Sequence, residues 1–290
     1  MNRRRFIEQS LSSALAVFIT PQVLTSLFEN EDVEICKRTF DRAVSRSLFQ
    51  RPIGEVVVEI GKSFLGTDYL AHALEVPGEE RLVVNLRGLD CVSLCENALV
   101  FARCVKLGKT SFEDYKAQLQ FIRYRGGIID QYPSRLHYFS DWIFDNGKKG
   151  VLRNMTREFG GERYLKPVNF MSTHPQAYRQ LRERPEFVEM IKQQEKEISQ
   201  REMFHISKNR IKEIEKNIDG GDMLAITTSI EGLDVSHTGI AVWKEERLHM
   251  LHAPDVGFKV TITDLPLAEY LQTFKRQMGI IVARPLEPRM

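Results

Sequence analysis

The sequence predicts an α+β domain, because helical patterns come first along the chain and short strand patterns come last. Apolar residues recur at helical spacing in residues 54–65 and 90–107, and glycines follow both segments. After Gly221 the pattern changes to short runs rich in β-branched residues, separated by turn or polar residues. We therefore expect helices packed against a mostly antiparallel sheet.

The expected elements follow in chain order. Helices are predicted over residues 32–48, 54–65 and 90–107, with a strand at 81–86. The middle of the chain should hold a helix at 115–124 capped by Ser111 and Asp114, and further helices at 134–146, 186–202 and 208–218. Strands are expected at 223–229, 238–243, 248–252 and 258–263, then a helix at 265–274 and a last strand at 279–283.

Composition excludes several classes of protein. The 290 residues carry a net charge of only +2, and no basic stripe is interleaved with aromatic residues, so we expect no nucleic-acid partner. The chain has four cysteines, but it is long enough to bury its own core and does not need a disulfide framework. Because no CxxC pair occurs, we expect no structural metal site.

The N-terminus has the pattern of an export signal. Arg3, Arg4 and Arg5 precede Phe6 and a modestly apolar stretch at residues 11–28. Consecutive arginines before phenylalanine resemble the twin-arginine type of signal. Polar residues and a proline interrupt the stretch, which makes it a poor membrane span. Residues 1–28 are thus expected to export the protein, to the periplasm, or to remain as an N-terminal anchor.

Cys91 is the candidate nucleophile. Gly88 and Asp90 can turn the chain and cap the helix that follows, which places Cys91 in the first helical turn. Unpaired N–H groups and the positive end of the helix dipole favour a thiolate there, and the same N–H groups can hold an oxyanion. A buried structural cysteine would produce the same local pattern.

Two histidines are candidates for the base. His237 stands at the entrance to a predicted strand, and His252 ends the next one. If these strands pair antiparallel, the two rings can meet on one face. One imidazole could then take the thiol proton while the other orients it.

The ordered motifs resemble the NlpC-type papain-like cell-wall hydrolases. The chain has Asp90-Cys91, Gly221-Asp222, His237-Thr238-Gly239-Ile240 and His252-Ala253, and upstream Leu65-Gly66-Thr67-Asp68-Tyr69. The resemblance implies a papain-like α+β fold, with the catalytic helix packed on an antiparallel sheet. It also implies a catalytic triad of Cys91, His237 and His252, with Tyr69 close to the nucleophile.

A second set of motifs resembles the N-acetylmuramoyl-L-alanine amidase-like branch of that family. These are residues 132–142, Asn169-Phe170-Met171-Ser172 with His174, and Gly232-Leu233-Asp234. The branch implies hydrolysis of the amide between N-acetylmuramic acid and L-alanine in muropeptides. Residues 29–290 would then form one domain with a mostly helical insertion at about 111–218. The expected substrate contacts, besides Tyr69, are Asp90, Arg135, His137, Asp141 and Trp142.

Three other hypotheses remain open. The first is a γ-D-glutamyl endopeptidase on the same scaffold, although the family's Asp-Cys-Ser-Gly is here Asp90-Cys91-Val92-Ser93, without the serine that helps to hold a free peptide amine. The second is a wall-binding protein without turnover. The third is a metal hydrolase that uses His237, His252 and a cysteine. The favoured hypothesis needs neither metal nor cofactor, and its partners are peptidoglycan fragments.

Overall fold

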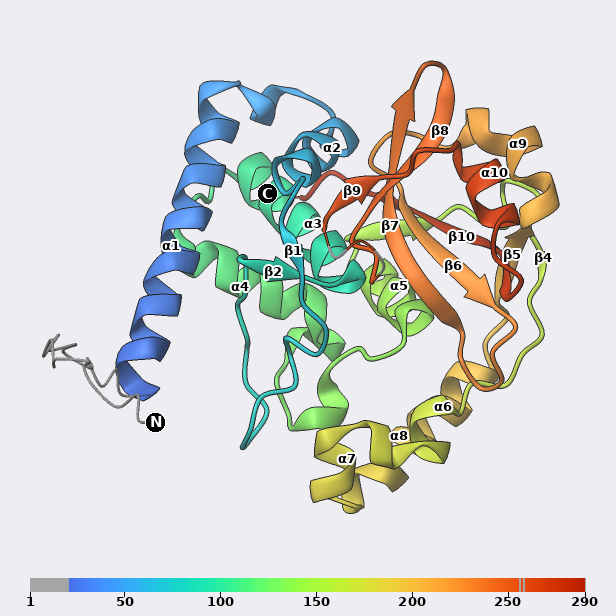
Figure 1. Cartoon of the computed structure of the whole chain (residues 1–290), viewed down its shortest axis with the longest axis horizontal. Coiled ribbons are helices and arrows are strands. Elements are labelled where there is room, and N and C mark those ends of the chain that lie inside the picture. The colour runs from blue at the N-terminus through green and yellow to red at the C-terminus, as the bar shows by residue number, and fades with distance from the viewer. Residues whose placement is uncertain (1–20, 256, 258, 290) are drawn as a thin grey trace, which may run out of the picture.

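Helices from the first part of the chain pack beside a sheet built largely from the last part (Figure 1). The computed structural model describes residues 21–255, 257 and 259–289. The helices of the first part are α1 (Pro21–Ser45), α2 (Ile53–Ser63), α3 (Cys91–Leu107) and α4 (Phe112–Arg123). Among the described residues, no helix combines the length and apolar character needed to span a membrane.

The main sheet is antiparallel throughout. Its strand order is β4-β5-β10-β6-β7-β8-β9, and β3 also pairs with β10. The strands from the last part of the chain are β6 (Met223–Thr228), β7 (Val235–Lys244), β8 (Arg247–His252), β9 (Thr261–Ile262) and β10 (Gln277–Pro285). A separate parallel pair joins β1 (Asp68–Tyr69) to β2 (Gly88–Leu89).

Helix α3 is the centre of the larger core. Leu94, Leu99 and Phe101 are fully buried on it, and they belong to the same apolar cluster as Ile240 and Val242 of β7. A second cluster joins the main sheet to α9 (Ile211–Ile214) and α10 (Leu267–Gln272). The predicted α+β class and the predicted packing of the Cys91 helix on an antiparallel sheet are therefore confirmed.

The middle segment, at about residues 111–218, has its own core. It contains α5 (Phe139–Lys148), α6 (Phe170–Thr173), α7 (Arg179–Glu183) and α8 (Glu186–Ser199). The core of this segment is a third apolar cluster, which includes the buried residues Tyr132, Tyr138 and Phe187. The segment also supplies β3 (Leu152–Asn154), β4 (Glu162–Arg163) and β5 (Phe204–Ser207) to the main sheet, which the sequence did not predict.

Two predicted elements are wrong: one strand does not form, and one helix begins later than predicted. Residues 81–86 form no strand, because side chains satisfy their backbone: Leu86 N donates to Asp32, and Arg123 donates to Val83 O. The helix expected at 134–146 begins only at Phe139, since Arg135 is extended and bridges to Tyr124.

The predicted export signal falls mostly on residues 1–20, which lie outside the described part of the chain. Residues 21–28 form the beginning of α1, which runs along one edge of the molecule (Figure 1, blue).

Candidate active site

Cys91 is the first residue of α3, as predicted, and a capping box fixes this end of the helix. Asp90 Oδ1 accepts from Ser93 N at 2.7 Å, and Ser93 Oγ accepts from Asp90 N at 2.9 Å. In the parallel pair just before α3, Tyr69 is the register partner of Leu89. The turn that presents the thiol is therefore held by its own side chains and by the neighbouring strand.

His237 and His252 meet across β7 and β8. Their Nε2 and Nδ1 atoms lie 2.8 Å apart, and the strands pair antiparallel with Ile240 opposite Leu251. Ser236 is the extra residue of a bulge just before His237, a device that re-aims side chains near sites. At Gly239 a Cβ atom would lie 2.5 Å from the Met250 side chain, so glycine allows this close approach. The predicted meeting of the two rings is confirmed.

Two hollows adjoin at Cys91 and His237. The larger has a volume of about 550 Å³, and Tyr69, His252 and Tyr270 contribute to its wall. The smaller has a volume of about 200 Å³ and is walled by residues of the middle segment, including Tyr132, His137, Tyr138 and Tyr178. Cys91, Ser236 and His237 line both hollows, so a substrate that occupies both would cross the Cys–His pair.

The thiol and both imidazoles are neutral at physiological pH. Burial, and then the adjacent Asp90 carboxylate, raise the pKa of Cys91 to about 11, whereas the nearby Thr238 side chain and backbone N–H lower it. Burial lowers the pKa of His237 to about 4 and that of His252, with the charge of His237, to about 3. The expected resting thiolate is therefore wrong: loss of hydration outweighs the helix dipole at this position.

Tyr69 also keeps its proton. Burial, followed by the charges of Cys91, Asp90 and Asp255, raises the pKa of Tyr69 to about 12. Its hydroxyl therefore remains available in the larger hollow as a hydrogen-bond donor.

Of the other predicted substrate contacts, only His137 lines a hollow at the site. His137 lines the smaller hollow, where its Nε2 lies 2.9 Å from Tyr132 O and where burial, with the Arg135 charge, holds its pKa well below the usual range. Asp90 serves as the helix cap. Arg135, Asp141 and Trp142 line neither hollow.

These last three residues are structural, which corrects the prediction that they contact substrate. Arg135 forms ion pairs with Glu75 and Glu80. Asp141 is 1% exposed and pairs with Arg125 and Arg201. Trp142 has no exposed surface, and its ring stacks on Phe139 with centroids 4.7 Å apart. A buried ring already stacked on one face cannot receive a sugar.

Sequence reasoning missed several cavity residues. These include Ser236, Asp255 and Tyr270 in the larger hollow, and Glu75 and Tyr178 in the smaller one. A usable signal existed for only one of them, since Ser236 directly precedes the candidate base. The structure does join two motif fragments: the N–H groups of Asn169 and Phe170 both donate to Gly232 O at 3.0 Å.

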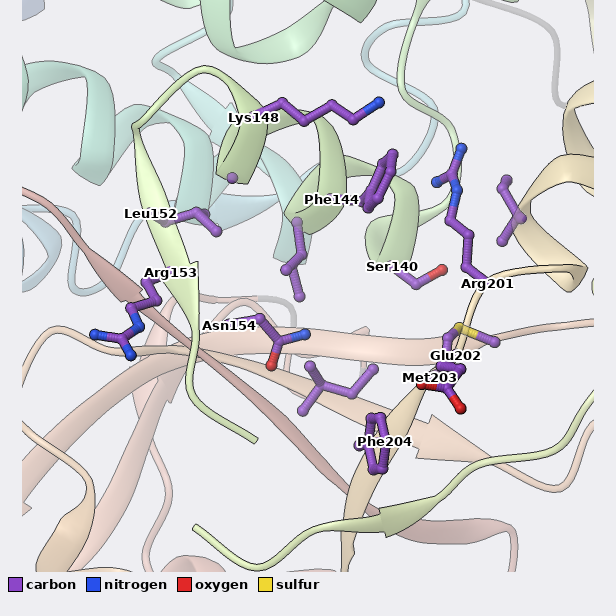
Figure 2. Close-up of a pocket in the computed structure, with 14 residues that line it drawn as sticks. Ser140, Phe144, Lys148, Leu152, Arg153, Asn154, Arg201, Glu202, Met203 and Phe204 are labelled. Carbon is purple, nitrogen blue, oxygen red and sulfur yellow. The ribbon is translucent and has the colours of Figure 1, made fainter. Parts of the chain in front are cut away.

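A third hollow, of about 430 Å³, lies away from these residues between α5, β3 and the segment that leads into β5 (Figure 2). The Lys148 ammonium and the Arg201 guanidinium both lie over the Phe144 ring there. No cysteine or histidine lines it, so it offers no cysteine–histidine pair. In the described part of the chain, no three His, Cys, Asp or Glu side chains cluster in a way that could hold a metal ion.

The chain is similar to known proteins over most of its length. A model of the N-acetylmuramoyl-L-alanine amidase-like family matches residues 59–280. An N-acetylmuramoyl-L-alanine amidase from Bacteroides uniformis has 36% identity and a TM-score of 0.77, over 81% of this chain and 99% of that one. A Bacteroides fragilis protein provisionally described as a xylanase has 38% identity and a TM-score of 0.74, over 77% and 98%.

More distant matches add less. A Legionella pneumophila protein with 20% identity and a TM-score of 0.67, over 90% of this chain and 96% of that one, shares the fold. No curated protein sequence matches the chain. Since the family model spans most of the sequence and the Bacteroides uniformis amidase aligns over nearly its full length, this chain belongs to the N-acetylmuramoyl-L-alanine amidase-like family.

Proposed function

We propose that the protein is a cysteine hydrolase with a papain-like fold that cleaves the amide between N-acetylmuramic acid and L-alanine in muropeptides. The observation that carries this proposal is the 2.8 Å contact between His237 and His252 where two hollows meet at the helix-start Cys91. Membership of an amidase-like family supplies the substrate class.

The histidine pair sets the direction of proton transfer. Because Nε2 of His237 faces Nδ1 of His252, Nδ1 of His237 is left to accept the thiol proton. This requires His237 to carry its hydrogen on Nε2 and to donate it to His252. Since the pKa of His252 is low, that ring stays neutral and keeps accepting when His237 becomes an imidazolium.

The reaction then proceeds in two halves. The Cys91 sulfur attacks the lactyl carbonyl carbon while its proton moves to His237, and the C–N bond breaks as His237 returns that proton to the departing alanine nitrogen. Water, deprotonated by His237, next attacks the thioester, and the proton returns to the Cys91 sulfur as the C–S bond breaks. We propose the Cys91 N–H and the Tyr69 hydroxyl as donors to the oxyanion in both halves.

The two hollows suit the two parts of such a substrate. Of the tyrosines that line the smaller hollow, Tyr178 is only partly buried, and its ring offers a stacking face for the muramyl ring. The larger hollow would hold the stem peptide. Tyr132, Tyr138 and Tyr178 belong to the middle segment, which we therefore propose as the source of glycan selection.

Mass spectrometry of the products formed from a defined muropeptide tests the bond that is cut. The proposal predicts free N-acetylmuramic acid and an intact stem peptide. A muramyl dipeptide as product would instead show a γ-D-glutamyl endopeptidase, and bound but unchanged muropeptide would show a wall-binding protein. Release of sugar from xylo-oligosaccharides would also contradict the proposal.

The N-terminal arginine pattern supports one more proposal, export to the periplasm. Fusion of residues 1–28 to a reporter tests it. Export of the reporter that is lost when Arg4 and Arg5 are both replaced by Lys would support a twin-arginine signal, and a cytoplasmic reporter would contradict export.

A further inference from the structure

One hydroxyl connects the nucleophile's helix to the base's strand. Thr238 follows His237 directly on β7, and its side chain is buried, with 1% exposure. Thr238 Oγ1 donates to the Cys91 carbonyl oxygen at 2.8 Å, and the Cys95 thiol donates to Thr238 Oγ1 at 3.7 Å. The chain of contacts therefore runs from the first turn of α3 to the strand and back to the second turn.

We propose that Thr238 is a positioning residue, whose hydroxyl holds the first turn of α3 against β7 and so fixes the Cys91 sulfur relative to the His237 ring. This inference rests on the proposed function, in which Cys91 and His237 exchange a proton. No motif considered from the sequence assigns a role to this side chain.

The geometry explains why a hydroxyl is used at this position. The first turn of α3 is otherwise tied mainly to itself, through the Asp90–Ser93 capping box. The bond to Thr238 crosses from the helix to the sheet, and it ends one residue away from His237. A displacement of about 1 Å between reacting groups can cost about 10²-fold in rate. A tie between the two backbones at this point keeps their separation constant.

Hydrogen-bond accounting supports a specific role over simple packing. A hydroxyl has one donor hydrogen and two acceptor lone pairs, and here the hydrogen goes to Cys91 O while a lone pair receives the Cys95 thiol. Valine has nearly the same shape but could make neither contact. Serine keeps the hydroxyl and lacks only a methyl group. The two substitutions therefore separate the hydrogen bonds from the volume.

Thr238 also influences the ionisation of the Cys91 thiol. Its side chain and backbone N–H lower the pKa of Cys91, against burial and the Asp90 charge, which raise it. The other titratable groups that face this region are Tyr69, Cys95, His237, His252 and Asp255. Of these groups only Cys95 bonds to the Thr238 side chain, and the Cys95→Ala variant controls for its loss, so a remaining shift in the titration of Cys91 can be assigned to Thr238.

The test compares Thr238→Val, Thr238→Ser and Thr227→Val in the full-length protein. Thr227 is an equally buried threonine on the neighbouring strand β6, where its hydroxyl bonds His205 instead. Each variant is measured for kcat and KM on a muropeptide, for the pH profile of Cys91 alkylation, and for its free energy of unfolding.

We expect Thr238→Val to lower kcat by at least about tenfold, with KM within about threefold, and to move the alkylation profile to higher pH. Thr238→Ser should keep kcat within about threefold of wild type. Thr227→Val should leave kcat and the pH profile of Cys91 alkylation unchanged, even if it lowers the free energy of unfolding. Cys95→Ala, which removes only the thiol donor, should also stay within about threefold.

The inference is overturned if Thr238→Val keeps both the wild-type kcat and the wild-type alkylation profile, or if Thr238→Ser fails as completely as Thr238→Val. Should Thr238→Val not fold, Thr238→Ser and Cys95→Ala still decide: a large kcat loss in either folded variant contradicts the proposal. Failure of the proposed function is distinguishable, because an active Cys91→Ala enzyme would refute it while the alkylation profiles still report on Thr238.

Discussion

Asp90 both caps helix α3 and opposes ionisation of the neighbouring Cys91 thiol. Asp90→Asn separates these two roles, because asparagine caps a helix as well as aspartate does but carries no charge. We therefore expect the variant to keep its stability, to have a lower Cys91 pKa, and to react faster with iodoacetamide.

The magnitude follows from Coulomb's law. At a separation of about 6 Å and an effective dielectric constant of about 40, two unit charges interact by about 1.4 kcal/mol, which is about one pKa unit. Well below the Cys91 pKa of about 11, a fall of one unit raises the thiolate fraction about tenfold. Because a less basic thiolate is a weaker nucleophile, with a Brønsted coefficient of about 0.45, the alkylation rate should rise about threefold to fourfold.

The assay is the alkylation rate of Cys91, followed by peptide mass spectrometry near neutral pH. Asp114→Asn is the matched control, since Asp114 belongs to the capping box of α4 and is remote from the thiol in the fold. Asp90→Ala should label faster too but should lose about 1 kcal/mol of stability with the cap. Labelling of Asp90→Asn at or below the wild-type rate, with unchanged unfolding, would refute the electrostatic reasoning.

Three further perturbations test other parts of the account. His237→Ala should cost at least about ten times more in kcat than His252→Ala, because the first removes the proton acceptor and the second only its orientation; equal losses in folded variants would mean that the roles are exchanged. Trp142→Ala should lower the free energy of unfolding by about 3–5 kcal/mol, and the partly exposed Phe144→Ala by much less; a stable Trp142→Ala that binds muropeptide poorly would restore the predicted stacking role. The pKa values of His237 and His252 are depressed from 6.5 to about 4 and about 3, so their contribution to stability is present above pH 6.5 and is lost as the pH falls through that window. For His237 this amounts to about 3 kcal/mol. The free energy of unfolding measured with urea should therefore fall as the pH is lowered below 6.5, and it should fall less steeply in His252→Gln. The same dependence on pH in His252→Gln as in the wild type would contradict the assignment.

Local signals carried the correct part of the sequence prediction. Asp90 and Gly108 bracket a helix predicted at 90–107, and in the structure they are its N-cap and its left-handed C-cap. The predicted strands near His237 and His252 pair antiparallel as expected, since a two-residue turn leaves little alternative. These features depend on residues a few positions apart, which a sequence displays directly.

The incorrect part depends on contacts between distant segments. Arg135 is neutralised by Glu75 and Glu80, which lie in an irregular segment far upstream, and no local pattern announces that pairing. Trp142 lies on an amphipathic helix whose buried face is set by α4 and β3. The prediction of a Cys91 thiolate is wrong for the same reason. The helix dipole can be inferred from the sequence, whereas the desolvation of the thiol depends on how the site is packed.

Strands β3, β4 and β5 of the main sheet also depend on contacts between distant segments, so the sequence alone did not predict them. Strands β3, β4 and β5 are short, and each is defined only by its partner in another part of the chain. Short runs of this kind carry too little periodicity to be distinguished from loops. In the structure, these short strands therefore interrupt the helices of residues 111–218.

Turnover of one muropeptide by Cys91→Ala tests whether the Cys91 sulfur attacks the substrate. Cys104→Ala is the matched control, because it removes a buried thiol from the same helix without approaching either hollow at the site. With both variants shown to be folded, we expect a loss of at least about 10³-fold for Cys91→Ala and near wild-type turnover for Cys104→Ala. Substantial amidase activity in folded Cys91→Ala would show that another group attacks the substrate.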